Sequence, residues 1–355
     1  MRRRSRIGER HRVRPTAPRL LAGVLVSALL WPHPSAARDG IVVKLATLVP
    51  NRSVWGNPLR EMSAEWKAAT EGRVTVRLYP DGVAGDDPDL VRKMRIGQLQ
   101  AATLTVTGLA EIDPAFALFE IPLFFDSYEE FFHLVAKMEP LFRKRLKSRG
   151  FVLLHWAHAG WINLFTTRPV TTVDEFKQLK FFVWAGNDSL VSWWRDNGFR
   201  PVPLAATDIL TGLQTGMIEA LPSTPLAALS LQWFRSTPHM LDLSFAPLIG
   251  ATVMTERAWN KISPVDQEAL LAIARHTEGR FRREIPQQDR VALAEMEKRG
   301  LNVTRVVGTE AEAEWREAAQ SFAANMRDAF VPSEVFDLAL GERELYRRRS
   351  EATGA

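Results

Sequence analysis

The chain has 355 residues, of which 46% are hydrophobic and 25% are charged, and it contains no cysteine. These proportions match soluble globular proteins, so they exclude an extensively disordered chain and a multi-span membrane protein, and the length favours about two domains. The absence of cysteine excludes disulfides, thiolate metal sites, cysteine nucleophiles and a lipid-modified cysteine. A formal net charge of +5 suggests an anionic partner only if the basic residues lie in the folded part of the chain.

The basic excess lies in the first 37 residues. Eight arginines and one acid give this stretch a charge of +7, so the remainder of the chain sums to −2. An apolar run, Leu20 to Trp31, follows the arginines, and small residues end at Ala37. This order predicts a secretory signal peptide that is cut after Ala37 and a periplasmic mature protein. The alternative is a disordered basic arm, but a slightly acidic mature chain offers nucleic acid no general attraction, so no nucleic-acid partner is expected.

The first part of the mature chain alternates between strand and helix patterns. Strands are predicted at 41–49, 73–79 and 101–106, and helices at 53–70 and 87–96. Asp87 followed by Pro88 is predicted as the N-cap and first residue of a helix. This alternation favours an α/β fold.

The second part repeats the alternation and ends in a long helix. Helices are predicted at 127–147, 188–197 and 207–215, and strands at 151–156, 161–166, 180–183 and 252–255. Thr172 and Glu175 form the pattern of a capping box at the start of a further helix. The helical pattern from Pro264 to Lys298 is interrupted only near Pro286, and a helix of that length is typical of one that bridges two lobes.

Residues that could carry catalysis or bind a metal are scarce. His155 and His158 are three apart in a predicted strand, which places their side chains on opposite faces and disfavours a shared metal. The acidic group Asp86, Asp87 and Asp89 lacks the glycine and distal glutamate of a calcium loop, so helix capping explains it better. We therefore predict no catalytic residue, no metal and no cofactor, and we expect that the protein is not an enzyme.

Several short segments resemble the solute-binding proteins of TRAP (tripartite ATP-independent periplasmic) transporters, of the DctP type. The segment Lys180–Trp184, preceded by Val173–Leu179, is similar to a lysine-isoleucine-arginine-valine-proline segment of that family. Four other segments agree in order and spacing: Gly72–Pro80 with Gly85, Ile121–Phe124, Leu213–Gly216 and Trp259–Pro264. The resemblance covers nearly all of the mature chain.

The resemblance implies a periplasmic-binding-protein-like fold with two α/β lobes, discontinuous chain crossings and a long connecting helix. It places lobe 1 at residues 38–159 plus 248–287, lobe 2 at 160–247 plus 288–341, and a C-terminal tail at 342–355. It also implies a ligand held between the lobes, hinge closure and delivery to a TRAP membrane permease. The pattern is similar to a subgroup that works with a tetratricopeptide-repeat partner.

The sequence departs from this family at the positions that bind carboxylates. Family members place an arginine where this chain has Phe182, and some place a second arginine at or beside Ile162, next to Trp161. Arginine holds a carboxylate through two parallel hydrogen bonds, which phenylalanine and isoleucine cannot supply. We therefore expect aromatic and hydroxyl contacts to a ligand. The predicted ligand-binding residues are Phe182, Trp161, Trp184, Ile162, Trp55, Phe125, Ser223 and Thr224.

These substitutions predict a mainly apolar or aromatic ligand, because an unpaired carboxylate loses several kcal/mol of solvation on burial. About 300 Å² of apolar burial contributes about 7.5 kcal/mol, which a four-carbon acid cannot supply. One alternative is an ordinary organic-acid receptor in which Phe182 packs inside a lobe and another cation, Arg52 or Arg168, binds the acid. A remote alternative is a periplasmic enzyme on the same scaffold.

Overall fold

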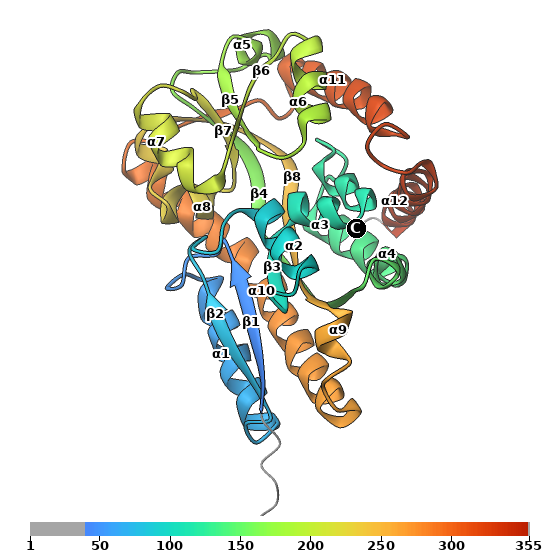
Figure 1. Cartoon of the computed structure of the whole chain (residues 1–355). Coiled ribbons are helices and arrows are strands. Elements are labelled where there is room, and N and C mark those ends of the chain that lie inside the picture. The colour runs from blue at the N-terminus through green and yellow to red at the C-terminus, as the bar shows by residue number, and fades with distance from the viewer. Residues whose placement is uncertain (1–39, 354–355) are drawn as a thin grey trace, which may run out of the picture. The chain divides into compact units, whose positions relative to one another are not determined.

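The structure is a computed structural model that describes residues 40–353. The predicted signal peptide and its cleavage site lie outside these residues. Nine strands form one mixed sheet in the order β2-β1-β3-β8-β4-β7-β5-β6, with β9 paired to β8 (Figure 1). The strands are β1 (Ile41–Thr47), β2 (Val74–Tyr79), β3 (Ala101–Thr105), β4 (Phe151–Thr166), β5 (Lys180–Trp184), β6 (Arg200–Leu204), β7 (Ala220–Ser223), β8 (His239–Thr255) and β9 (Asn302–Arg305).

Helices cover this sheet and connect its strands. They are α1 (Gly56–Ala69), α2 (Asp87–Arg95), α3 (Val106–Ile112), α4 (Tyr128–Ser148), α5 (Val173–Lys177), α6 (Asp188–Asp196), α7 (Ile209–Gln214), α8 (Pro225–Ser230), α9 (Glu256–Trp259), α10 (Pro264–Lys298), α11 (Glu310–Met326) and α12 (Ser333–Thr353), with short 3₁₀ helices at Pro114–Glu120, Ala206–Asp208 and Trp233–Arg235. No helix in the described part of the chain has the length and hydropathy that crossing a bilayer requires.

Two long strands join the two lobes. The first half of β4 pairs with the second half of β8, from Phe151 opposite Thr255 to His158 opposite Ile249. Its second half pairs with the first half of β8, and the register shifts between His158 and Trp161. Parallel strands β1, β2 and β3 extend the sheet on one side, and β7, β5 and β6 extend it on the other. The expected two-lobed α/β fold is therefore confirmed.

The helices hold their positions through apolar faces at helical spacing. In α1, buried Leu59, Met62 and Trp66 lie on one face, as expected of a helix that covers a sheet. The largest apolar cluster surrounds Phe116, Phe119 and neighbouring rings of the first lobe. Helix α10, predicted at the same residues, contacts β4, α1 and α8, so it adjoins elements of both lobes (Figure 1).

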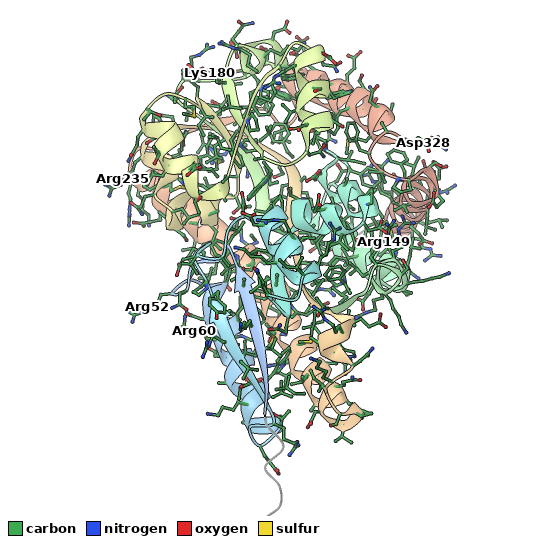
Figure 2. All side chains as sticks on the ribbon, in the orientation of Figure 1. Arg52, Arg60, Arg149, Lys180, Arg235 and Asp328 are labelled. Carbon is green, nitrogen blue, oxygen red and sulfur yellow. The ribbon has the colours of Figure 1, made fainter. Side chains whose placement is uncertain are left out.

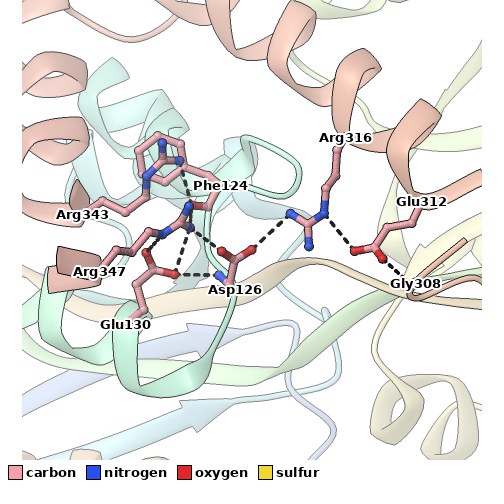
Figure 3. A network of polar contacts seen from close by, with 8 residues as sticks. All are labelled: Phe124, Asp126, Glu130, Gly308, Glu312, Arg316, Arg343 and Arg347. Carbon is pink, nitrogen blue, oxygen red and sulfur yellow. Dashed lines mark hydrogen bonds and ion pairs between the residues drawn. The ribbon is translucent and has the colours of Figure 1, made fainter. Parts of the chain in front are cut away.

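The last helix binds the first lobe through a polar network. Arg347 of α12 pairs with buried Glu130 at 2.6 Å and with Asp126 at 2.8 Å, and Arg343 donates to the carbonyl of Phe124 (Figure 3). Arg316 of α11 also pairs with Asp126, at 3.2 Å. Residues 342–353, which the sequence assigned to a tail, continue α12. This helix packs against α4 rather than on the second lobe.

Local predictions from the sequence were partly right. The capping box of Thr172 and Glu175 is present. The N-cap of α2 is Asp86 rather than Asp87, because the Asp86 carboxylate accepts the Asp87 N–H at 2.9 Å. The segments predicted at 151–156 and 161–166 are one continuous strand.

Candidate ligand-binding site

Where β4 passes between the lobes, its backbone lies unusually close to Asp289 of α10. Gly160 lies in the register shift of β4 and has φ +116°, a conformation that other residues rarely adopt. A Cβ at this position would lie 2.7 Å from the carboxylate of Asp289 on α10. Glycine is therefore required for this part of β4 to contact the long helix.

Asp289 connects three elements in this region. Its Oδ2 accepts the backbone N–H of Trp161 at 3.0 Å, and its Oδ1 accepts that of Leu226, in the first turn of α8, at 2.8 Å. Its side chain is buried, and burial raises the pKa of its carboxyl to about 6, although the two hydrogen bonds oppose the shift. Asp289 makes no salt bridge to any described residue, so it is a buried acid without a cation.

Asn163 fixes the strand on the far side of the register shift. Its Oδ1 accepts the N–H groups of Leu243 at 3.2 Å and Ser244 at 3.0 Å, and its amide donates to the Trp161 carbonyl at 3.2 Å. Asn163 is also the register partner of Ser223 on β7. Together with Asp289, it sets the backbone of the segment that carries Trp161 and Ile162.

Trp161 is buried against an aromatic group of the first lobe. Its ring contacts Tyr128 edge-on with centroids 5.0 Å apart, and Tyr128 lies 5.7 Å from the ring of His158. Two atoms in this group, Trp161 Nε1 and the Tyr128 hydroxyl oxygen, are buried without a hydrogen-bond partner among the described residues. Buried polar groups normally find partners, so this region has unused capacity to bind polar atoms.

Phe182 and Trp184 lie together on β5. Their ring centroids are 5.3 Å apart. Phe182 is only 4% exposed and packs in the second lobe with Phe165, Ile209 and Leu221, whereas Trp184 is half-buried. The position at which relatives are expected to have arginine is thus part of an apolar core.

The remaining predicted contacts fall into separate places. Trp55 packs with Leu226 at the start of α8, and its Nε1 has no partner among the described residues. Thr224 caps α8 by accepting the Ala227 N–H at 3.2 Å, and buried Ser223 precedes it. Phe125 is buried in the first-lobe cluster. Asp289 and Leu226 therefore link Trp161 to Trp55 and the start of α8. Phe125 shares the large first-lobe cluster with Trp161, while the pair on β5 belongs to a separate cluster.

A cross-lobe contact was missed by the sequence analysis. The Asp86 carboxylate accepts the N–H of Ala206, in the second lobe, at 3.0 Å. Next to it, Asp87 is fully buried, accepts the N–H of Thr105 at 3.1 Å and also binds the Thr105 hydroxyl. Burial raises the pKa of Asp87 to about 7. The run of acids at 86–89 is the sequence signal for this contact, but its pattern predicts only helix capping.

Apart from histidine, the buried ionisable side chains of the described chain are all acidic. Within the described residues, no lysine or arginine is buried, whereas Asp87, Asp113, Glu130, Asp266 and Asp289 are. Three of these acids have arginine partners: Asp113 pairs with Arg145, Glu130 with Arg347, and Asp266 with Arg73. Asp87 and Asp289 have none within the described range, and both lie near the contact between the lobes.

The alternative cations are on the surface. Arg52 and Arg168 are both exposed, and Figure 2 shows Arg52 on the loop after β1 pointing outward. His155 is fully buried and its ring lies 6.0 Å from that of Phe281. No group of three or more histidine, aspartate or glutamate side chains in residues 40–353 is arranged to hold a metal ion.

Comparison with known proteins identifies one family. The model of "Bacterial extracellular solute-binding protein, family 7" (DctP) matches residues 45–328. A solute-binding protein of Chromohalobacter salexigens is 26% identical over 61% of this chain and 64% of its own length. The 2,3-diketo-L-gulonate-binding periplasmic protein of Escherichia coli is 24% identical over 66% and 72%, respectively.

Solved structures share the fold at low sequence identity. A Bordetella pertussis extracytoplasmic solute receptor that binds pyroglutamic acid has a TM-score of 0.78 and 18% identity, with 85% of this chain and 99% of that chain covered. A TRAP periplasmic solute-binding protein of Chromohalobacter salexigens with bound D-glucuronate has a TM-score of 0.77 and 20% identity, with the same coverage.

Proposed function

The chain belongs to family 7 of the bacterial extracellular solute-binding proteins, and we propose that it is the periplasmic receptor that delivers an organic solute to a TRAP-type membrane permease. The names of the relatives support a periplasmic location, and export through a signal peptide at residues 1–37 is part of the proposal. The family consists of receptors, so binding and release, rather than turnover, is the proposed activity.

The proposed ligand carries no net negative charge and combines an apolar or ring portion with hydrogen-bond acceptors. The single observation that carries this is the pair of buried carboxyls, Asp87 and Asp289, without a buried cation in the described chain. Burial raises the pKa of Asp289 only to about 6, so this carboxyl is mainly charged at neutral pH, and an anion placed near it would lose solvation and meet like charge. The unpartnered indole N–H groups of Trp161 and Trp55 can donate to an acceptor on such a ligand.

The ligands named for relatives count against a purely apolar compound. Solved relatives bind pyroglutamic acid, galacturonate and glucuronate, and a relative from Ruegeria pomeroyi is named for binding ectoine and 5-hydroxyectoine. They favour a second candidate, an organic acid bound through Arg52 or Arg168. Under that candidate, Arg52→Ala or Arg168→Ala would abolish acid binding.

The test is native mass spectrometry of the purified mature protein, followed by calorimetry with ectoine, D-glucuronate and D-galacturonate. We expect recovery of an uncharged or zwitterionic compound and acid binding weaker than micromolar, which corresponds to less than about 8 kcal/mol. Micromolar or tighter binding of D-glucuronate, lost in either arginine variant, would establish the organic-acid candidate instead. A tetratricopeptide-repeat partner stays a sequence-based prediction, which co-purification can examine.

A further inference from the structure

The carboxylate of Asp289 connects the long helix to two segments that carry predicted ligand contacts. One oxygen accepts the N–H of Trp161 on β4, at 3.0 Å, and the other accepts the N–H of Leu226 on α8, at 2.8 Å. Trp161 adjoins Ile162, and Leu226 lies two residues after Thr224. Both segments contain predicted ligand contacts, and they are separated from Asp289 by 128 and 63 residues, respectively.

The surrounding backbone is shaped to admit this carboxylate. Gly160 brings β4 so close that a Cβ would lie 2.7 Å from three atoms of the Asp289 carboxyl group, and its φ of +116° is compatible mainly with glycine. The register of β4 against β8 also shifts at this point. The two N–H groups approach different oxygens of Asp289, so in this arrangement each needs its own acceptor atom.

A second buried acid on the same helix, Asp266, shows how Asp289 differs from an aspartate that belongs to an ion pair. Asp266 is also buried in α10, but it receives two hydrogen bonds from Arg73, and its N–H donates to the hydroxyl of the N-cap residue Ser263. Asp289 has no such cation. The charged and titratable groups that face it are the Tyr128 hydroxyl on α4 and Arg290 on its own helix, with His158 beside Tyr128.

We propose that Asp289 is a positioning residue for ligand binding, which holds the Trp161 segment and the start of α8 in one arrangement. The inference rests on the proposed receptor function and adds to it a named residue that touches no ligand. If the carboxylate is protonated or replaced by an amide, one of the two backbone N–H groups loses its acceptor. The two segments then separate, and the side chains that they carry no longer converge.

The first experiment requires no ligand. The backbone amide resonances of Trp161 and Leu226 are followed by NMR between pH 4.5 and 7.5 in ¹⁵N-labelled mature protein. We expect both to titrate together with one apparent pKa near 6, the value to which burial raises the Asp289 carboxyl, and Asp289→Asn to remove that titration. Independent titrations, or an unchanged titration in Asp289→Asn, would overturn the proposal.

The second experiment separates positioning from stability, with ectoine and D-glucuronate as probes. Asp289→Asn should weaken whichever probe the wild-type protein binds by about tenfold, the equivalent of one charge-assisted hydrogen bond. The matched control, Asp266→Asn, should lose stability but keep its affinity within about twofold, because it is remote from both segments. Equal affinity losses in both variants would overturn the positioning role. If neither probe binds the wild type, the proposed ligand class loses support while the amide titration still decides the role of Asp289.

Discussion

At the scale of single residues, Phe182 shows that a sequence motif can mark a position without predicting where its side chain lies. The motif predicts that relatives have arginine at this position, and the structure buries Phe182 to 4% exposure in the second-lobe core. Asp289 could not be predicted at all, because its partners are 128 and 63 residues away. A hydrogen bond between distant segments leaves no periodic pattern in either segment.

Arginine at position 182 should therefore destabilise the protein rather than create an acid site. A guanidinium placed in this apolar cluster would lack an anionic partner, and a buried unpaired charge costs about 3–5 kcal/mol. Chemical denaturation of Phe182→Arg should show a loss of that size, whereas the control Phe182→Leu should lose less than about 1.5 kcal/mol. A stable Phe182→Arg protein that binds D-glucuronate would show that the side chain faces the ligand.

At the scale of elements, long periodic segments were predicted well and paired segments poorly. The helix from Pro264 to Lys298 was predicted at the same residues as α10, since its caps and spacing are local signals. Of β8, His239–Thr255, only the last four residues were expected. Its first half includes Pro247 and a left-handed Ser244, and it becomes a strand through pairing with β4 and β9. The polar anchoring of α12 likewise depends on contacts with a distant helix.

The anchoring of α12 should depend mainly on one arginine. Arg347→Ala leaves the Glu130 side chain, 2% exposed, without its ion-pair partner. The expected loss is about 2–3 kcal/mol, reduced from the usual cost of breaking a buried pair because Arg347 is itself partly exposed. Arg316→Ala is the matched control, since it removes a half-exposed pair with Asp126 worth less than about 1 kcal/mol. Equal denaturation midpoints for the two variants would contradict this ranking.

At the scale of the whole described chain, residues 82–88 of the first lobe lie against residues 186 and 206–207 of the second lobe. Asp86 binds Ala206, and ideal Cβ positions at Gly82 and Gly186 lie 3.1 Å from Thr207 and 3.0 Å from Pro88. Only Asp86 contributes a hydrogen bond among these. Burial raises its pKa, so its charged form, which accepts most strongly, is lost at a higher pH than for an exposed aspartate.

Replacing Asp86 by serine should shift the ligand-free protein toward an open arrangement. Serine can still cap α2, so the variant removes the bond to Ala206 and keeps the bond to the Asp87 N–H. One lost hydrogen bond of about 1 kcal/mol changes the closed-to-open ratio by about fivefold. Small-angle scattering should show a larger radius of gyration for Asp86→Ser than for the wild type. Asp89→Ser, on the same helix, should match the wild type. Identical scattering curves for all three proteins would show that the Asp86–Ala206 hydrogen bond does not hold the lobes closed.

The shared sheet has a consequence for how the protein is made. Strand β3 lies between β1 and β8, and its β8 partners are about 150 residues further along the chain, as with Thr103 and Thr252. During synthesis, the edge of β3 that pairs with β8 therefore remains unpaired until most of the chain has emerged. A nascent chain that cannot complete its sheet early stays extended for longer, and the unpaired edge of β3 is then open to pairing with another chain.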